Sequence, residues 1–200
     1  MTDPYKASIG YPVPKEIRAD VVTISHEHGD HNNEEVLVGN PRIIRTPGIH
    51  EACGFRVQGI PSDHDDQGGQ VRGSNMIFVV ETEGLRICHC GDLGQMLTDQ
   101  QMEAIGHVDI LMVPIGGVYT IDAKGAREVV RALNPKVVIP MHYRTDLAGD
   151  ELDGPETFLE YMTQDEYAVS MHHAKTQQYT IADFPKRYKV LVMEPTCGKE

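Results

Sequence analysis

The segment "ADVVTISHEHGDHNN", residues 19–33, joins a short apolar run directly to a cluster of histidine and acidic residues. The run Ala19–Ser25 predicts a buried strand, because it is short, rich in β-branched residues and ends in polar ones. His26–His31 follow without a spacer, so the end of a strand holds their backbone in place. Gly29 permits a tight backbone path within the cluster. The sequence therefore predicts several ligand-type side chains close together at the edge of a sheet.

The composition of the cluster leaves two interpretations open. A polar turn is common after any strand and needs no function. Imidazole nitrogens and carboxylate oxygens are also ligands that suit zinc, iron or manganese. In that case His26 and His28 would point toward one centre, and Asp30 and His31 toward another. A pair of metals would need further ligands from distant segments.

Three later segments offer such ligands. His64 lies in "IPSDHDDQGG", Asp92 in "CHCGDLG" and His142 in "VIPMHYRT". Each of these residues comes where a strand-like apolar run stops, and such positions are where rigid scaffolds carry binding and catalytic groups. The pattern favours a metal site assembled from several strand ends.

The chain mixes strand and helix patterns with no internal repeat or linker, which predicts one α/β domain over residues 1–200. Several short strands precede the first long helix, so sheets packed between helices are favoured over regular strand–helix alternation. Helices are expected at 98–106, 122–135 and 155–162, the second with an apolar face of Ala126, Val129, Val130 and Leu133. Further strands are expected in "RIIRT", "GFRVQGI", "NMIFVVET", "LRICHC", "DILMVP", "KVVIP", "QQYTIA" and "YKVLVM", with a hairpin turn at Glu83-Gly84.

Charge and composition exclude several classes of partner. The formal net charge is −12 at pH 7 with a pI near 5.2, so the chain repels nucleic-acid phosphates and anionic membrane surfaces. No apolar stretch approaches the roughly 20 residues of a membrane span. The start has no signal-peptide pattern, and the four cysteines show no disulfide-framework spacing. We therefore expect a cytoplasmic protein that acts on a small molecule, with no membrane or nucleic-acid partner.

The motifs resemble those of a known family. "HEHGDH" matches the His-x-His-x-Asp-His signature of the metallo-β-lactamase-fold hydrolases, and Gly91-Asp92 and "PMHY" around His142 follow in the expected order. "PIGGVYTIDAKGA", residues 114–126, is similar to the branch that contains L-ascorbate-6-phosphate lactonase and related predicted zinc hydrolases. The resemblance covers nearly the whole chain. It implies an αββα sandwich of two mixed sheets flanked by helices, and it says little about substrate because this fold hosts many reactions.

The resemblance implies a ligand set for two divalent metals. Zinc is expected, with manganese or iron as alternatives. His28 separates the chain from the flavodiiron proteins of this fold, which carry glutamate there, and so favours a hydrolytic pair. Asp92 would bridge the two ions. The first metal would be held by His26, His28 and His64, and the second by Asp30, His31 and His142.

The implied reaction is hydrolysis of a small ester, lactone or phosphate ester by a water that the two metals activate. Asp92 and Asp30 are the catalytic candidates. Asp30 would orient the attacking water and hand a proton to the leaving group. Two alternatives remain open, a phosphodiesterase or nuclease of the same fold and a non-catalytic metal-binding or scaffold protein. The acidic net charge disfavours a nuclease, because nucleases of this fold usually need a basic surface. The full set of candidate ligands disfavours a non-catalytic scaffold.

Some other residues attract attention without a firm assignment. Asn75, Tyr119 and Tyr143 are candidates for substrate contact, although packing around the site would also account for the tyrosines. The run Cys88-His89-Cys90 could form an alternative structural zinc site with His50 and Cys53, but packing in the core is the favoured interpretation. His107 is expected at a helix end, and His172-His173 on the surface.

The beginning of the chain departs from the resemblance. Family members usually start with two or more strands before an Asp-Pro segment, and here "TDPY" already stands at residues 2–5. The first sheet is therefore expected to lack its N-terminal strands. An uncovered sheet edge and apolar face would favour a homo-oligomer. A gene start placed too late is the rival explanation.

Overall fold

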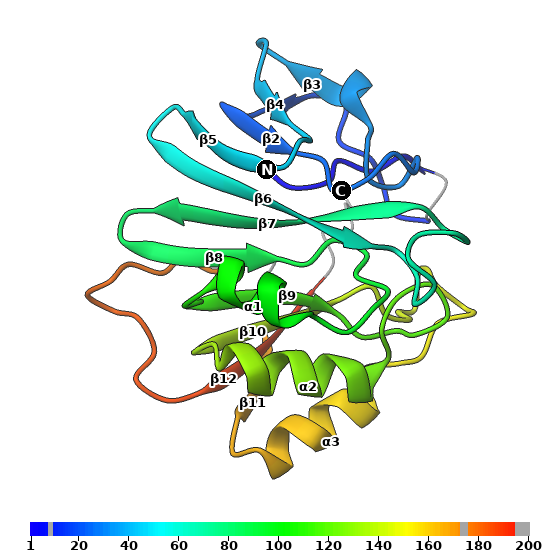
Figure 1. Ribbon diagram of the computed structural model, residues 1–200, viewed down its shortest axis with the longest axis vertical. Helices are drawn as coiled ribbons and strands as arrows, with labels where there is room; N and C mark the ends of the chain where they lie inside the picture. Colours follow the sequence, from blue (N-terminus) through cyan, green and yellow to red (C-terminus); the bar gives the residue numbers. More distant parts are fainter. Residues whose placement is uncertain (8–9, 173–175, 195–200) are drawn as a thin grey trace.

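A large mixed sheet forms the centre of the computed structural model, which describes residues 1–7, 10–172 and 176–194 (Figure 1). Its eight strands are β5 (Gly48–Ala52), β6 (Phe55–Asp63), β7 (Ser74–Thr82), β8 (Leu85–His89), β9 (Ile110–Pro114), β10 (Val137–Met141), β11 (Ala168–His172) and β12 (Lys189–Met193). They lie in the order β11-β12-β10-β9-β8-β7-β6-β5. The pairs from β5 to β8 are antiparallel and those from β8 to β11 are parallel.

Two small parallel sheets lie beside the large one. β2 (Val21–Thr23) pairs with β4 (Arg42–Ile44), and β1 (Ile17–Arg18) pairs with β3 (Leu37–Val38) after the 3-10 turn η2 (Glu34–Val36). The first residues of the chain extend the β2 sheet, because Thr2 bridges Thr23 and the amide of Asp3 donates to the carbonyl of Thr23. The N-terminal segment is thereby fixed next to the histidine cluster.

Three α-helices are described, and their ends follow the local sequence. α1 (Asp99–Ile105) begins with a capping box in which Thr98 and Gln101 satisfy each other's backbone amides. α2 (Ala123–Leu133) is capped by the Asp122 side chain and ends at Asn134 in the left-handed conformation. α3 is Glu156–Gln164. No helix within the described ranges is long and apolar enough to cross a membrane.

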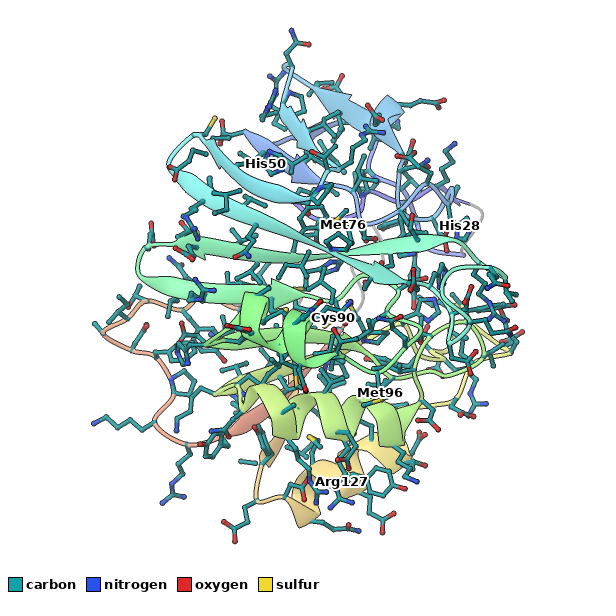
Figure 2. The ribbon with its side chains drawn as sticks, in the orientation of Figure 1. His28, His50, Met76, Cys90, Met96 and Arg127 are labelled. Carbon is teal, nitrogen blue, oxygen red and sulfur yellow. The ribbon has the colours of Figure 1, made fainter. Side chains whose placement is uncertain are left out.

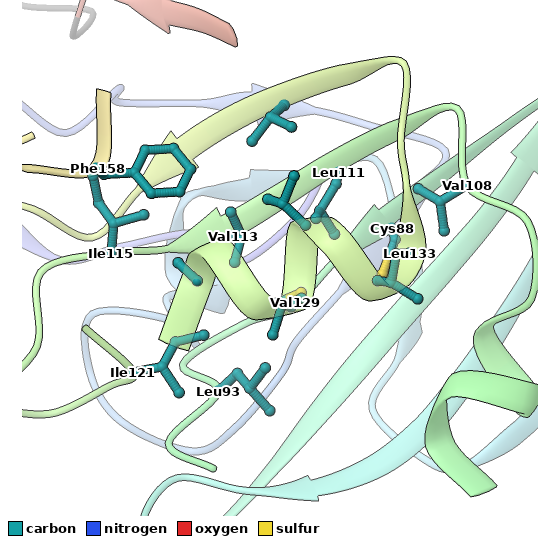
Figure 3. Packing of buried hydrophobic residues seen from close by; sticks show 14 of the residues in the cluster. Cys88, Leu93, Val108, Leu111, Val113, Ile115, Ile121, Val129, Leu133 and Phe158 are labelled. Atoms are coloured by element: carbon teal, nitrogen blue, oxygen red, sulfur yellow. The ribbon is translucent and has the colours of Figure 1, made fainter. Parts of the chain in front are cut away.

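Alternation along the strands divides the core between the two faces of the large sheet. Ile77 and Val79 of β7 belong to the main cluster, to which all three helices contribute side chains, whereas Phe78 packs with Val21 and Ile44 of the β2–β4 sheet. Figure 3 shows part of the main cluster, including Val129 and Leu133 of α2 and Phe158 of α3. This alternation is the period of two expected for strands that are buried on both faces. The expected apolar face of α2, consisting of Ala126, Val129, Val130 and Leu133, is buried in the main cluster.

The α/β class with a mixed sheet is confirmed, and two details of the prediction are wrong. The segment "QQYTIA" forms no strand; Tyr179 and Phe184 instead cover an apolar cluster on the sheet face. Strands β1, β3, β5 and β11 were not expected. The two sheets of the expected sandwich are present, the second as the small β2–β4 and β1–β3 pairs; the three described α-helices contribute to the main cluster and not to the cluster that joins β2–β4 to the large sheet.

Candidate metal centre

The candidate ligands gather because several strands end at the same edge of the large sheet. β6 and β8 run in the same direction, since each is antiparallel to β7, and β9 and β10 are parallel to β8. His64 follows β6, Asp92 follows β8 and His142 follows β10 directly. The loop with His26–His31 leaves β2 of the small sheet and reaches the same place. Figure 2 draws His28 at this end of the sheet and His50 toward the other.

The Asp92 carboxylate lies at the centre of the cluster and is only 3% exposed. Its Oδ2 atom is 3.4 Å from Nε2 of each of His31, His64 and His142, and 3.9 Å from Nε2 of His26. One carboxylate oxygen therefore faces four imidazole rings from three different segments. This is the arrangement that a bridging ligand would have.

The other candidates complete two groups around Asp92. Ligand atoms of His26, His28 and His64 lie within 4.8 Å of one another, and so do those of His26, His31 and Asp92. Asp30 reaches the second group, with Oδ2 3.6 Å from Nε2 of His31. The structure thus places all seven candidates in one cluster: His26, His28, Asp30, His31, His64, Asp92 and His142.

Hydrogen bonds behind the cluster orient two of its rings. The Asp3 carboxylate accepts hydrogen bonds from the Ser25 amide, the Ser25 hydroxyl and Nδ1 of His31. Because the Ser25 hydroxyl donates to Asp3, its oxygen accepts from Nδ1 of His26 at 2.9 Å. Nε2 of His26 is then an acceptor, yet it is buried and has no hydrogen-bond partner among the described residues. A buried, unpartnered imidazole acceptor beside carboxylates fits a metal cation.

The ionisation of the cluster follows from burial and from the two carboxylates. Burial and the neighbouring His31 lower the pKa of His26 to about 4. Burial would also lower the pKa of His31, but hydrogen bonds to Asp3 and Asp92 outweigh it and raise the pKa to about 10. For Asp92 burial favours the neutral acid, and His142 and His31 outweigh it, so its pKa is well below the usual range. The charged state of Asp92 is the one that binds cations.

Asn75 lines a hollow with His26 and His28, and its side chain is held by hydrogen bonds within the protein. Its side chain is 1% exposed and donates to the Ser62 hydroxyl and the Cys90 carbonyl, while its Oδ1 accepts from the Asp92 amide. All of its polar atoms are thus used to connect β6, β7 and the loop after β8. This geometry favours a role in positioning Asp92 over contact with substrate.

The two tyrosines face a cavity of about 660 Å³ beside the cluster. Tyr119 and Tyr143 line it together with Asp30, Asp92 and His142. The Tyr119 ring is 40% exposed and its centroid is 6.5 Å from that of His142. Burial raises the pKa of Tyr143, so its hydroxyl remains a neutral donor. The cavity is large enough for a small molecule to reach the proposed ligands.

The other histidines and cysteines form no second cluster within the described ranges. Cys88 and Cys90 are buried in the main apolar cluster, as expected of packed residues, and Cys53 is exposed at the β5–β6 turn. His50 lies within hydrogen-bonding distance of the Thr46 carbonyl. His107 follows α1 and pairs with Asp109. The side chain of His172 and all of His173 lie outside what the structure describes.

Three supporting residues were missed at the level of sequence. Asp3 and Ser25 orient proposed ligands, and Asp65 organises the loop after His64 by accepting four backbone N–H groups. Ser25 and Asp65 stand directly next to candidate ligands in the sequence, which is the signal that could have identified them. The role of Asp3 has no comparable local signal besides the Asp-Pro pair, because its partners are more than 20 residues away in the sequence.

Comparison with known proteins gives the family. The profile described as "Beta-lactamase superfamily domain" matches residues 1–142. Proteins described as "UPF0173 metal-dependent hydrolase" from Thermoplasma acidophilum and Thermococcus onnurineus are 35% and 32% identical over 158 residues, which cover 66% of this chain and 69% and 70% of theirs. A crystal structure from Thermotoga maritima, of a candidate zinc-dependent hydrolase of the metallo-β-lactamase superfamily, is 39% identical with a TM-score of 0.75, and the match covers 96% of this chain and 87% of that one. The chain therefore belongs to the β-lactamase superfamily, within its family of metal-dependent hydrolases.

Proposed function

We propose that this protein hydrolyses a small ester, lactone or phosphate ester at a centre of two divalent metals. The observation that carries the proposal is the position of the Asp92 carboxylate, which faces His31, His64 and His142 at equal distances of 3.4 Å. Four histidines around one buried carboxylate are costly to hold together without a cation, because the cluster leaves a buried acceptor on His26 without a partner.

The proposed ligands divide between the two ions as the resemblance implies. Zinc is the proposed metal, and manganese and iron are the alternatives. When bound, the metals supply an activated water and stabilise the negative charge that develops at the reacting centre. Asp92 would be shared by both ions. His26, His28 and His64 would hold the first metal, and Asp30, His31 and His142 the second.

Asp30 is the residue we assign to proton transfer. Its side chain is 38% exposed, whereas that of Asp92 is 4% exposed, and it lines the cavity next to His31. A carboxylate at the boundary between the ligand cluster and the cavity can accept a proton from the attacking water. It can then return that proton to the leaving oxygen. Asp92 has no comparable access and serves to hold the cluster together.

Metal analysis followed by a substrate panel tests the proposal. The protein is purified without chelator, reconstituted separately with zinc, manganese or iron(II), and assayed with esters, lactones and phosphodiesters. We expect close to two metals per chain and turnover of an ester or lactone. Turnover of phosphodiesters alone would favour the phosphodiesterase alternative. Two bound metals without any turnover would favour the non-catalytic alternative, and less than half a metal per chain would contradict the proposal.

Assembly, location and domain count stay predictions. We expect a homo-oligomer in a cytoplasmic setting and one domain over residues 1–200. Val169 and Met171 are exposed apolar residues on the edge strand β11, which supports association through an apolar contact. Sedimentation of the metal-loaded protein tests the first expectation, and a monomer at every concentration would contradict it.

A further inference from the structure

Arg72 places a guanidinium group beside the proposed centre without an ion-pair partner among the described residues. Its Cζ atom lies 5.5 Å from the centroid of the Tyr119 ring, which stands next to His142. Arg45, which lines the same hollow as Arg72, His26 and His28, is neutralised by Glu27 and Glu34. Arg72 is therefore a charged group held by an aromatic face and available to a ligand.

The loop that carries Arg72 is built by one buried side chain. The Asp65 carboxylate accepts hydrogen bonds from the backbone N–H groups of Gln67, Gly69, Val71 and Arg72 at 2.7–2.9 Å. Four charge-assisted hydrogen bonds give the loop a defined shape. The Arg72 backbone is thus fixed directly, eight residues after His64.

The loop that carries Tyr119 is held in a strained conformation. Val118 has a φ of 56°, a left-handed conformation that a β-branched residue rarely adopts. The amide of Tyr119 donates to the carbonyl of Gly117, and Ile121 is anchored to the carbonyl of Leu93. Strain of this kind persists where the surrounding structure imposes it, and it is concentrated at functional sites. The hydrogen bonds of Asp65 in one loop and the left-handed conformation of Val118 in the other therefore hold Arg72 and Tyr119 in contact.

Arg72 and Tyr119 each line a hollow that is also lined by candidate metal ligands. Arg72 lines one of about 270 Å³ with His26 and His28, and Tyr119 lines the larger cavity with His31 and His142. The described lining of the larger cavity includes no lysine or arginine and has five acidic residues: Asp3, Asp30, Asp92, Glu151 and Glu194. Through its contact with Tyr119, Arg72 adds a permanent positive charge next to this acidic cavity.

We propose that Arg72 is a specificity-determining residue that binds an anionic group of the substrate, a carboxylate or a phosphate, at a position separate from the bond that is hydrolysed. The inference rests on the proposed function and narrows its substrate class to anionic esters or lactones. A planar guanidinium suits both groups because it donates two parallel hydrogen bonds to an oxyanion. Tyr119 acts as a positioning residue that keeps the guanidinium over its ring.

A matched set of esters tests the proposal on the metal-loaded protein. The 4-nitrophenyl esters of butyric, succinic and 3-phosphonopropionic acid share the reacting bond and differ in the distal group, so the last two distinguish a carboxylate from a phosphate-like anion. We expect Arg72→Met to lower the preference for an anionic over the neutral ester about tenfold or more in kcat/KM, mainly through KM. A tenfold change in kcat/KM corresponds to about 1.4 kcal/mol of transition-state binding. Arg72→Lys should restore part of the preference.

Two further sets of variants separate specificity from structure. Arg18 is exposed, lines neither hollow and carries the same charge, so Arg18→Met should leave the preference unchanged. Tyr119→Phe keeps the ring under Arg72 and should keep the preference, whereas Tyr119→Ala should reduce it as Arg72→Met does. A ratio of anionic to neutral turnover that is the same in Arg72→Met and the unsubstituted protein would overturn the inference.

A binding measurement keeps the inference testable if no ester is turned over, a result that would count against the proposed function alone. The 4-nitroanilides of succinic and butyric acid resist hydrolysis and differ in the same distal group. Calorimetric titration should show that the succinyl anilide binds to the unsubstituted metal-loaded protein about tenfold or more tightly than it binds to Arg72→Met. Equal affinities of the two proteins for the succinyl anilide would refute the role of Arg72.

Discussion

Asp3 and His31 are joined by a hydrogen bond of 2.9 Å between a carboxylate oxygen and Nδ1 of the ring. The same carboxylate binds Ser25, whose hydroxyl accepts a hydrogen bond from His26. One acidic side chain from the start of the chain therefore orients two residues that we propose as ligands of different metals. Carboxylate partners of this kind fix the ring and raise the basicity of the ligating nitrogen.

Replacement of Asp3 should weaken both metals without removing a ligand. Asp3→Asn keeps the size of the side chain but loses the charge that His31 contacts, so we expect metal affinity to fall by about 10–100-fold. Competition with a fluorescent chelator measures this. Asp20→Asn is the control, because that aspartate is exposed in the link between β1 and β2. Unchanged affinity in Asp3→Asn would show that the hydrogen bond has no role in holding the metals.

The two ends of the large sheet offer a matched pair of histidine substitutions. His64→Ala should lower the metal content below two per chain, because the ring faces Asp92 at 3.4 Å. His50→Ala removes a partly exposed ring on β5, which Figure 2 draws away from His28, and should keep both metals. Plasma emission spectroscopy of dialysed protein provides the count. Two metals retained in His64→Ala would remove His64 from the proposed ligand set.

Gly94 is required by the close approach of its loop to His64. A Cβ atom at this position would lie 2.2 Å from the His64 carbonyl carbon and 2.4 Å from the Asp65 amide nitrogen. Because both contacts are backbone, Gly94→Ala should cost about 1–3 kcal/mol in the free energy of unfolding or more. It should also reduce metal content. Urea denaturation and metal analysis measure the two effects.

Gly54→Ala is the control that separates the contact of Gly94 with the His64–Asp65 backbone from the conformational strain of replacing any glycine. Gly54 has a φ of 83° but no atom within 4 Å of an added Cβ. Its replacement should cost stability through the left-handed backbone and leave the metals in place. Full metal content in Gly94→Ala would contradict the expected coupling between this loop and the site.

The sequence indicated which candidate ligands come together, but it did not indicate the hydrogen bonds that support them. His64, Asp92 and His142 could be found because each follows an apolar run, and periodicity detects such runs. The hydrogen bonds of Asn75 were not foreseen, because nothing local in the sequence shows that its amide connects β6, β7 and the Asp92 loop. The Asp3–His31 bond likewise depends on the tertiary path of the chain.

The errors in the fold have the same origin. "QQYTIA" has the composition of a strand, but Tyr179 packs onto the sheet face and Thr180 binds Asp183, so the segment covers the sheet and does not join it. β11 was missed even though it pairs with β12 along five residues. Propensity does not say which of two apolar segments finds a free sheet edge.

Tyr167 should make the fold sensitive to alkaline pH. Burial raises its pKa to about 12, and its hydroxyl donates to the Pro135 carbonyl at 2.9 Å. The pKa of an unfolded tyrosine is about 10, so the neutral form stabilises the folded state below pH 10 and this contribution is lost as the pH rises toward 12. Urea unfolding between pH 9 and 12 measures the slope. Tyr167→Phe should be less stable at pH 9 and should lose less stability over that interval; equal slopes would contradict the assignment.

Asp30→Asn separates the chemical role of Asp30 from its role as a ligand. The amide oxygen can still face the second metal, so we expect most of the metal to remain. An amide cannot accept and return a proton, so turnover should fall by about 10²–10⁴-fold, the usual range for loss of general acid–base catalysis. Asp92→Ala is the comparison, because it should lose metal and activity together. The measurement combines metal content with kcat on the same sample, using the ester that the unsubstituted protein hydrolyses. Metal-loaded Asp30→Asn with an unchanged kcat would assign the proton transfer to another group, and loss of both metals would show that Asp30 acts first as a ligand.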